Sequence, residues 1–164
     1  MVATFSVLEH IENIGQAFSN FSTALRTGGL FLAIFGPVWS SPYGHHLYID
    51  VLDPRSNFCL WDMPAFLHLL CTPNELCDYY YAIGYGREQI ELILHNIYDV
   101  KTINRIFYED YVDRLNEHFC LAASRMFYNR LPRNVYDALR SKYPRYRDFS
   151  TYGGIWIAIK NDPA

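Results

Sequence analysis

The stretch that decides the fold runs from Val2 to Phe35 and reads VATFSVLEHIENIGQAFSNFSTALRTGGLFLAIF. Residues 2–8 predict a short buried strand that leads into a turn. A helix follows, because apolar residues then recur at helical spacing through residue 25. Residues 30–35 are six apolar residues without alternation, which is typical of a central strand covered on both faces in a parallel sheet. A strand, a helix and a strand in this order form a βαβ unit, so we expect an α/β fold.

Local signals mark both ends of the predicted helix. Asn13 is a suitable N-cap, and Gln16 stands three residues later, as in a capping box. Gly28 follows the last helical residues and is free to take the left-handed conformation that ends a helix.

The remaining chain predicts further elements but no second domain, so residues 1–164 are taken as one domain. Residues 38–75 contain four prolines and many polar residues, and long loops of this kind are usually functional. The other predicted elements are helical segments at 74–96 (interrupted by Gly84 and Gly86), 103–115 and 135–143, and strands at 118–127 and 154–160.

Composition excludes several classes of protein. A chain with 51% hydrophobic and 19% charged residues is not a disordered one. The net charge of −3 gives no field that would recruit nucleic acid or anionic lipid, and the basic residues between 133 and 147 are better explained as a solvated helix face. The four cysteines form no CxxC pair and have no histidine at zinc-ligand spacing, which predicts free thiols and no metal site. Without a signal peptide or membrane span, we expect a soluble, cytoplasmic protein that binds no membrane.

Candidate site residues lie in the long loop after residue 36. His45 and His46 follow the carboxyl end of a predicted strand, where α/β sheets place their ligands, and histidine titrates near neutral pH. They are candidate catalytic bases, and the alternative is a pair of histidines that brace the loop. Trp39 and Tyr43 are candidates for the wall of a substrate pocket, and aromatic core or interface is the competing explanation.

An ordered series of motifs resembles a known family. Val7-Leu8-Glu9-His10-Ile11 is followed by an amphipathic helix, Ala24-Leu25-Arg26-Thr27-Gly28-Gly29, an apolar strand and Gly36-Pro37. This series is similar to the second half of a class I S-adenosylmethionine-dependent methyltransferase, although Thr27 replaces the usual proline. Further similarity, in Phe35–Ser41 and Gly44-His45-His46, is to methyltransferases of bacterial glycan and small-molecule pathways.

The resemblance implies a partial Rossmann-like methyltransferase fold, with strands four to seven and their flanking helices. It implies methyl transfer to a hydroxyl of a small molecule or saccharide, with Ser6, Glu9 and His10 on the cofactor side. The family's glycine-rich turn and first three strands have no counterpart, as a truncated gene or a miscalled start codon would produce. We therefore expect this chain to bind S-adenosylmethionine weakly or not at all.

Two alternatives stay open. One is a non-catalytic half-fold that acts as an interaction module and forms a homodimer through an exposed sheet edge. The other is a different α/β enzyme, for which the sequence offers no GxSxG, phosphate-binding loop or Cys–His signature.

Overall fold

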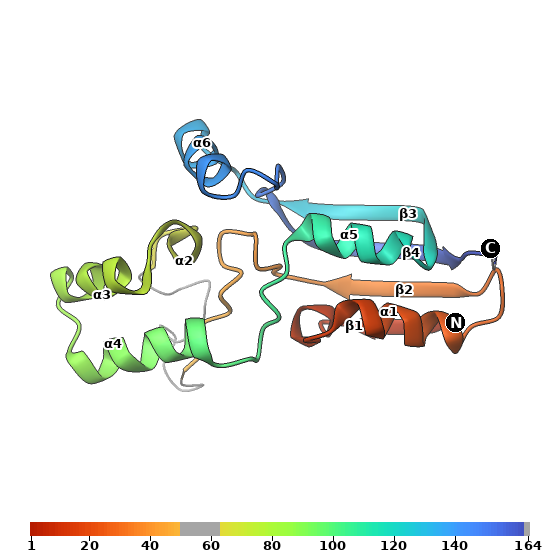
Figure 1. Ribbon diagram of the computed structural model, residues 1–164, viewed down its shortest axis with the longest axis horizontal. Helices are drawn as coiled ribbons and strands as arrows, with labels where there is room; N and C mark the ends of the chain where they lie inside the picture. Colours follow the sequence, from red (N-terminus) through yellow and green to blue (C-terminus); the bar gives the residue numbers. More distant parts are fainter. Residues whose placement is uncertain (50–62, 163–164) are drawn as a thin grey trace.

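The computed structural model describes residues 1–49 and 63–162, and its centre is a four-stranded mixed sheet (Figure 1). The strands are β1 (Val2–Phe5), β2 (Leu30–Phe35), β3 (Phe119–Tyr128) and β4 (Thr151–Lys160), in the spatial order β1-β2-β4-β3. β1 and β2 are parallel, and β4 runs antiparallel to both of its neighbours. The protein therefore has a mixed α/β fold.

The predicted βαβ unit is present at the amino-terminal end. The turn η1 (Leu8–His10) and the helix α1 (Ile14–Thr23) connect β1 to β2. The Asn13 side chain accepts a hydrogen bond from the Gln16 N–H at 3.0 Å, which confirms the predicted N-cap. The Gln16 side chain donates to Asn20 instead of completing the capping box. Gly28 has φ 72° and so takes the predicted left-handed conformation, but α1 already ends at Thr23 with Ala24 as its C-cap, so Gly28 is not the residue that ends the helix.

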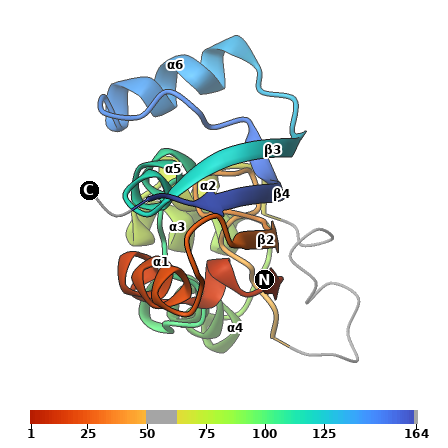
Figure 2. The ribbon, with the colours of Figure 1, turned by 90° about the vertical axis from the view of Figure 1, so that its right-hand side faces the viewer.

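One face of the sheet is covered by α1 and by α5 (Tyr108–Asn116) (Figure 2). Phe18, Phe31, Tyr111 and Trp156 are fully buried in the core between these layers. The expectation that residues 30–35 are covered on both faces is wrong, because exposure alternates along β2 and Leu30 is 43% exposed. The sequence does not alternate because both faces of β2 are apolar, and the described residues cover one of these faces more fully than the other.

A second hydrophobic cluster lies beyond the carboxyl ends of β1 and β2 (Figure 1). We call it the helical lobe. It consists of α2 (Leu67–Leu70), α3 (Pro73–Ala82), α4 (Arg87–Leu94), the π-helix η3 (His95–Asp99) and α6 (Arg133–Lys142). The helical prediction for residues 74–96 is confirmed, with the break at Gly84, whose φ is 92°.

The helix predicted from Ile103 begins only at Tyr108. The preceding residues are held in other conformations: Arg105 has φ 51°, and the Asn104 side chain donates hydrogen bonds to the carbonyls of Leu8 and Ile11. Ile103 is still buried, so the apolar residue that suggested a helix here is a core residue outside the helix. The other predicted strands and the helix at 135–143 are present within three residues of their expected ends.

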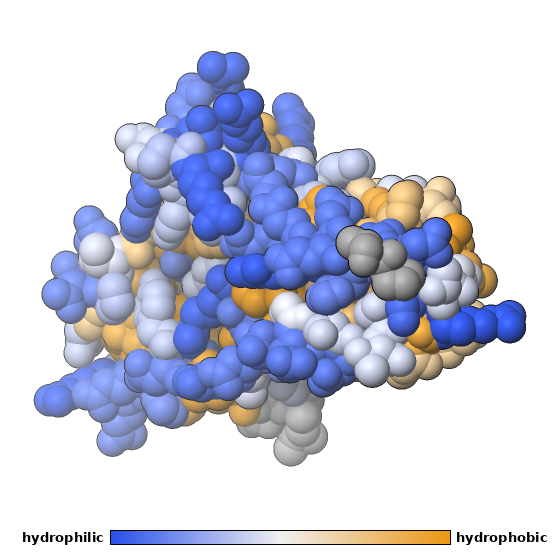
Figure 3. Space-filling model, turned by 45° about the vertical axis from the view of Figure 1, so that its right-hand side comes forward, coloured by the Kyte–Doolittle hydropathy of each residue, from blue (hydrophilic) through white to orange (hydrophobic). Residues whose placement is uncertain are grey.

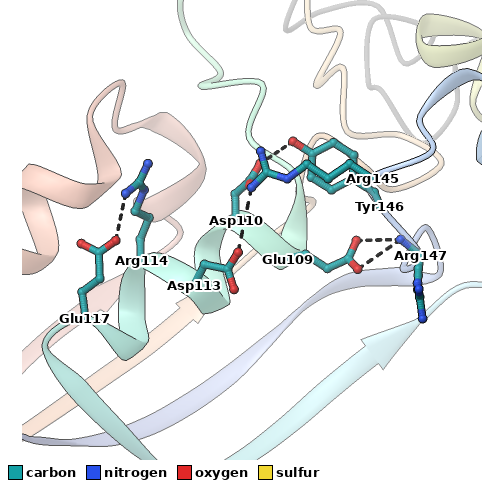
Figure 4. Close-up of polar contacts among 8 residues, drawn as sticks. All are labelled: Glu109, Asp110, Asp113, Arg114, Glu117, Arg145, Tyr146 and Arg147. Carbon is teal, nitrogen blue, oxygen red and sulfur yellow. Dashed lines mark hydrogen bonds and ion pairs between the residues drawn. The ribbon is translucent and has the colours of Figure 1, made fainter.

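The polar side of α5 holds the segment that joins α6 to β4 (Figure 4). Asp110 accepts hydrogen bonds from the Arg145 guanidinium at 2.7 Å and from the Tyr146 hydroxyl at 2.8 Å. The Glu109 carboxylate accepts two hydrogen bonds from the backbone N–H of Arg147. Arg145 thus pairs with a carboxylate of its own chain, and the backbone of Arg147 is held by another.

No helix within residues 1–49 and 63–162 combines the length and apolar character that a membrane span requires. Cys71, Cys77 and Cys120 are free thiols, and Cys59 lies outside the described residues.

Candidate functional site

A cavity of about 340 Å³ lies where the carboxyl end of β1 meets the helical lobe. It is lined by His10, His46, Tyr48, Asn96, Thr102 and Ile103. Its volume is at the small end of the range for ligand pockets, about 300–1,000 Å³. None of these described lining residues is a lysine, arginine, aspartate or glutamate, so this part of the lining suits a neutral polar molecule better than an ion.

His10 is the exposed imidazole of this cavity. Its Nδ1 lies 2.7 Å from the carbonyl oxygen of Thr102, and a carbonyl can only accept, so Nδ1 carries the hydrogen. The lone pair of a neutral His10 is therefore on Nε2. A backbone carbonyl fixes the tautomer and orientation of catalytic histidines in the same way.

His46 lies beside His10, with ring centroids 5.6 Å apart in an edge-to-face arrangement. Its Nε2–H donates to the Pro37 carbonyl at 2.6 Å, so the ring lone pair is on Nδ1. Burial, partly offset by this hydrogen bond, lowers the pKa of His46 to about 4, and the ring is neutral at pH 7. Its backbone has φ 48°, a conformation that histidine adopts more readily than most residues.

The loop reaches this position because of Gly44. A Cβ atom at Gly44 would lie 2.2 Å from the Val38 carbonyl oxygen, so only glycine permits the close approach of these two backbone segments. The loop can therefore turn back on itself and carry His46 to the cavity.

Glu9 is buried next to His10 in sequence, with 1% of its surface exposed. Oε1 accepts a hydrogen bond from the Gly36 N–H at 3.4 Å, and Oε2 has no hydrogen-bond partner within the described part of the chain. Burial raises the pKa of this carboxyl group. Glu9 therefore stands behind the site and not at its surface.

Asn104 holds the segment that carries Glu9 and His10. Its Nδ2 donates to the carbonyls of Leu8 at 2.7 Å and Ile11 at 2.9 Å, and its backbone N–H donates to the Glu9 carbonyl at 3.0 Å. The Tyr111 hydroxyl donates to Asn104 Oδ1 at 2.8 Å. We did not identify these two residues from the sequence. The available signal was an asparagine within a predicted helix, because its amide competes for backbone partners.

His45 is separated from His46 and lies in the helical lobe. His45 is 3% exposed, and its ring centroid lies 5.2 Å from that of His68. Nδ1 of His45 accepts from the Leu47 N–H, so Nε2 carries the hydrogen, which finds no acceptor among the described residues. Burial lowers the pKa of both rings, that of His68 to about 4.

Trp39, Tyr43 and Ser6 also lie outside the cavity lining. Trp39 is 7% exposed and packs against His68 with centroids 4.7 Å apart, as expected of an aromatic core residue. Tyr43 is half-buried near His45. Ser6 is exposed and donates its N–H to the Ile34 carbonyl, which continues the pairing of β1 with β2. Of the residues chosen from the sequence, the structure brings together His10 and His46.

Within the described ranges, no group of three or more His, Cys, Asp or Glu side chains is arranged to hold a metal ion. Comparison with protein-family models, curated protein sequences and solved structures gave no match for this chain.

Proposed function

We propose that this chain is the acceptor-side half of a class I S-adenosylmethionine-dependent methyltransferase domain that acts on a hydroxyl of a small neutral molecule or saccharide. The observation that carries the proposal is the sheet: its order is β1-β2-β4-β3, and the last strand alone runs against its neighbours. In the class I methyltransferase fold the last strand is likewise antiparallel and lies between the fifth and sixth strands. The resemblance was based on the sequence motifs of residues 2–37. The order and directions of the four strands support it without using those motifs.

The position of the cavity also supports this function. α/β sheets bind their ligands beyond the carboxyl ends of their strands, and the cavity lies beyond the end of β1. His10 and His46 both line it, and a backbone carbonyl holds the ring of each. A positioned imidazole can take the proton of an acceptor hydroxyl as that oxygen becomes nucleophilic. We assign this role to His10 or His46, and we leave His45 out because its ring is buried against His68.

The described residues do not by themselves fit S-adenosylmethionine. Gly84 and Gly86 lie between α3 and α4, so they form no turn between a strand and a helix. The Glu9 carboxylate is buried and cannot receive ribose hydroxyls. We therefore expect this cytoplasmic chain to bind S-adenosylmethionine weakly or not at all.

Titration of the ¹⁵N-labelled chain with S-adenosylmethionine, followed by amide chemical shifts, tests the proposal. We expect shifts confined to residues 6–10, 36–46 and 102–103, with a dissociation constant weaker than about 1 mM. His46→Ala should reduce these shifts, whereas His95→Ala, which removes an exposed imidazole paired with Asp99, should not. Shifts that fall elsewhere would count against the proposal.

A further inference from the structure

The face of the sheet opposite α1 and α5 is a continuous apolar surface, which we call the open face. The strand register places Phe5 beside Ile34, Leu32 beside Ile157, and Ile157 beside Ala123 on this one side. Residues that alternate with them, such as Phe31 and Trp156, are buried on the other side. The open face consists of Ala3, Phe5, Leu30, Leu32, Ile34, Cys120, Ala123, Arg125, Phe127, Ile155, Ile157 and Ile159.

Several side chains of this surface are strongly exposed, whereas Leu32, Ile34 and Ile155 are half-buried. Phe5 is 59%, Ile157 41% and Ile159 38% exposed, although β4 is an interior strand of the sheet. Figure 3 shows hydrophobic residues gathered along the right-hand margin of the molecule, the side on which the open face lies in Figure 2. Single exposed apolar residues are ordinary, but a contiguous apolar patch of several hundred Å² marks an interaction surface.

The charge and the exposed area of the open face both limit which partner can bind to it. Arg125, on the outer strand β3, is the one charged residue of the open face, so an identical surface meets little repulsion. Its eight large apolar side chains together expose on the order of 600 Å². Two such faces would bury about 1,200 Å², the lower limit for a specific protein–protein interface.

We propose that the open face binds the open face of a second copy of this chain, packed sheet on sheet around a two-fold axis. An isologous contact needs a surface that is complementary to itself, and a nearly uncharged apolar sheet meets this condition. Paired sheets pack about 10 Å apart with interdigitating side chains, as in a β-sandwich. This proposal is independent of the methyltransferase assignment.

A face-to-face pair differs from a dimer formed through the sheet edge. The sheet has two edges: β1, which offers Val2–Phe5 for strand pairing, and β3, which offers Phe119–Tyr128. Ile157 lies on β4, an interior strand, and its side chain is on the face of the sheet. Edge pairing would leave Ile157 in solvent, whereas face packing would bury it.

Sedimentation equilibrium of the full chain at increasing concentration tests the inference. We expect a monomer–dimer equilibrium that Ile157→Lys weakens at least tenfold. Leu92→Lys is the matched control, because Leu92 is 44% exposed on α4 and should leave the equilibrium unchanged. Ile157→Ser makes the same test with a smaller change, should the lysine variant fail to fold by circular dichroism.

Three results would overturn the inference. One is a monomer at every concentration, and another is a dimer that neither substitution at Ile157 weakens, as edge pairing would give. The third is a series of ever larger oligomers, because a closed two-fold pair stops at two.

Discussion

Replacing Asn104 by alanine should destabilise the protein, because the Asn104 side chain holds the segment that carries His10. The side chain makes four hydrogen bonds: it donates to the carbonyls of Leu8 and Ile11 and accepts from the Tyr111 hydroxyl and the Ile106 N–H. Each bond contributes about 1 kcal/mol net, and a buried partner left unpaired costs more. Because the amide is only part-buried and water can replace some contacts, we expect Asn104→Ala to lower the free energy of unfolding by about 3 kcal/mol.

Tyr111→Phe isolates one of these contacts. It removes the hydroxyl that donates to Asn104 Oδ1 and leaves the buried ring in place, so the expected loss is about 1 kcal/mol. The double variant should lose less than the sum of the two single variants, since they share one bond.

Urea denaturation followed by tryptophan fluorescence measures these differences, because Trp156 is fully buried in the native core. Asn20→Ala, which removes an exposed side-chain bond on α1, serves as the control and should stay within about 0.5 kcal/mol of the wild type. A loss below about 1 kcal/mol for Asn104→Ala would refute the reasoning, since it would mean that this amide does not hold the His10 segment.

Three other predictions concern the buried polar groups and the tight backbone contacts. Burial lowers the pKa values of His45, His46 and His68 below the ordinary 6.5, so the unfolded chain takes up protons at a higher pH than the folded chain. The free energy of unfolding should therefore be largest above pH 6.5 and should decline as the pH falls toward 4. Urea titrations at several pH values measure this slope, and His68→Gln should make it smaller. Gly44→Ala should lower the free energy of unfolding by about 3 kcal/mol, because the new Cβ would overlap the Val38 carbonyl oxygen. Gly28→Ala should lower it by about 1 kcal/mol, because that site has open space and only its positive φ is unfavourable for alanine. Equal losses for the two variants would contradict the overlap at Gly44. Glu109→Ala should lower the thermal midpoint by an amount that corresponds to about 1–2 kcal/mol, because the Arg147 N–H loses its carboxylate acceptor. Glu109→Gln should recover part of this loss, because the amide oxygen can still accept the hydrogen bond.

Elements specified by neighbouring residues were predictable from the sequence. Asn13 marks the start of α1 by accepting a hydrogen bond from the Gln16 N–H, and Gly28 lies in the turn before β2 with a left-handed φ, so the βαβ unit is visible without knowing the rest of the chain. The helix predicted from Ile103 failed for a different reason. Asn104 finds its partners near Leu8 and Ile11, more than ninety residues away, and these long-range bonds replace the first helical turn.

The sequence alone determined that this chain forms an α/β fold with a loop of candidate site residues after its second strand, because apolar periodicity and capping act over a few residues. Only the tertiary structure decided which histidine rings lie next to each other. Adjacent residues on a tight loop point in different directions, so His46 reaches the cavity beside His10, whereas His45 packs against His68. Likewise, an unalternating apolar strand shows that both of its faces are apolar. Which face is covered depends on where distant helices pack, and here both α1 and α5 pack on the same side.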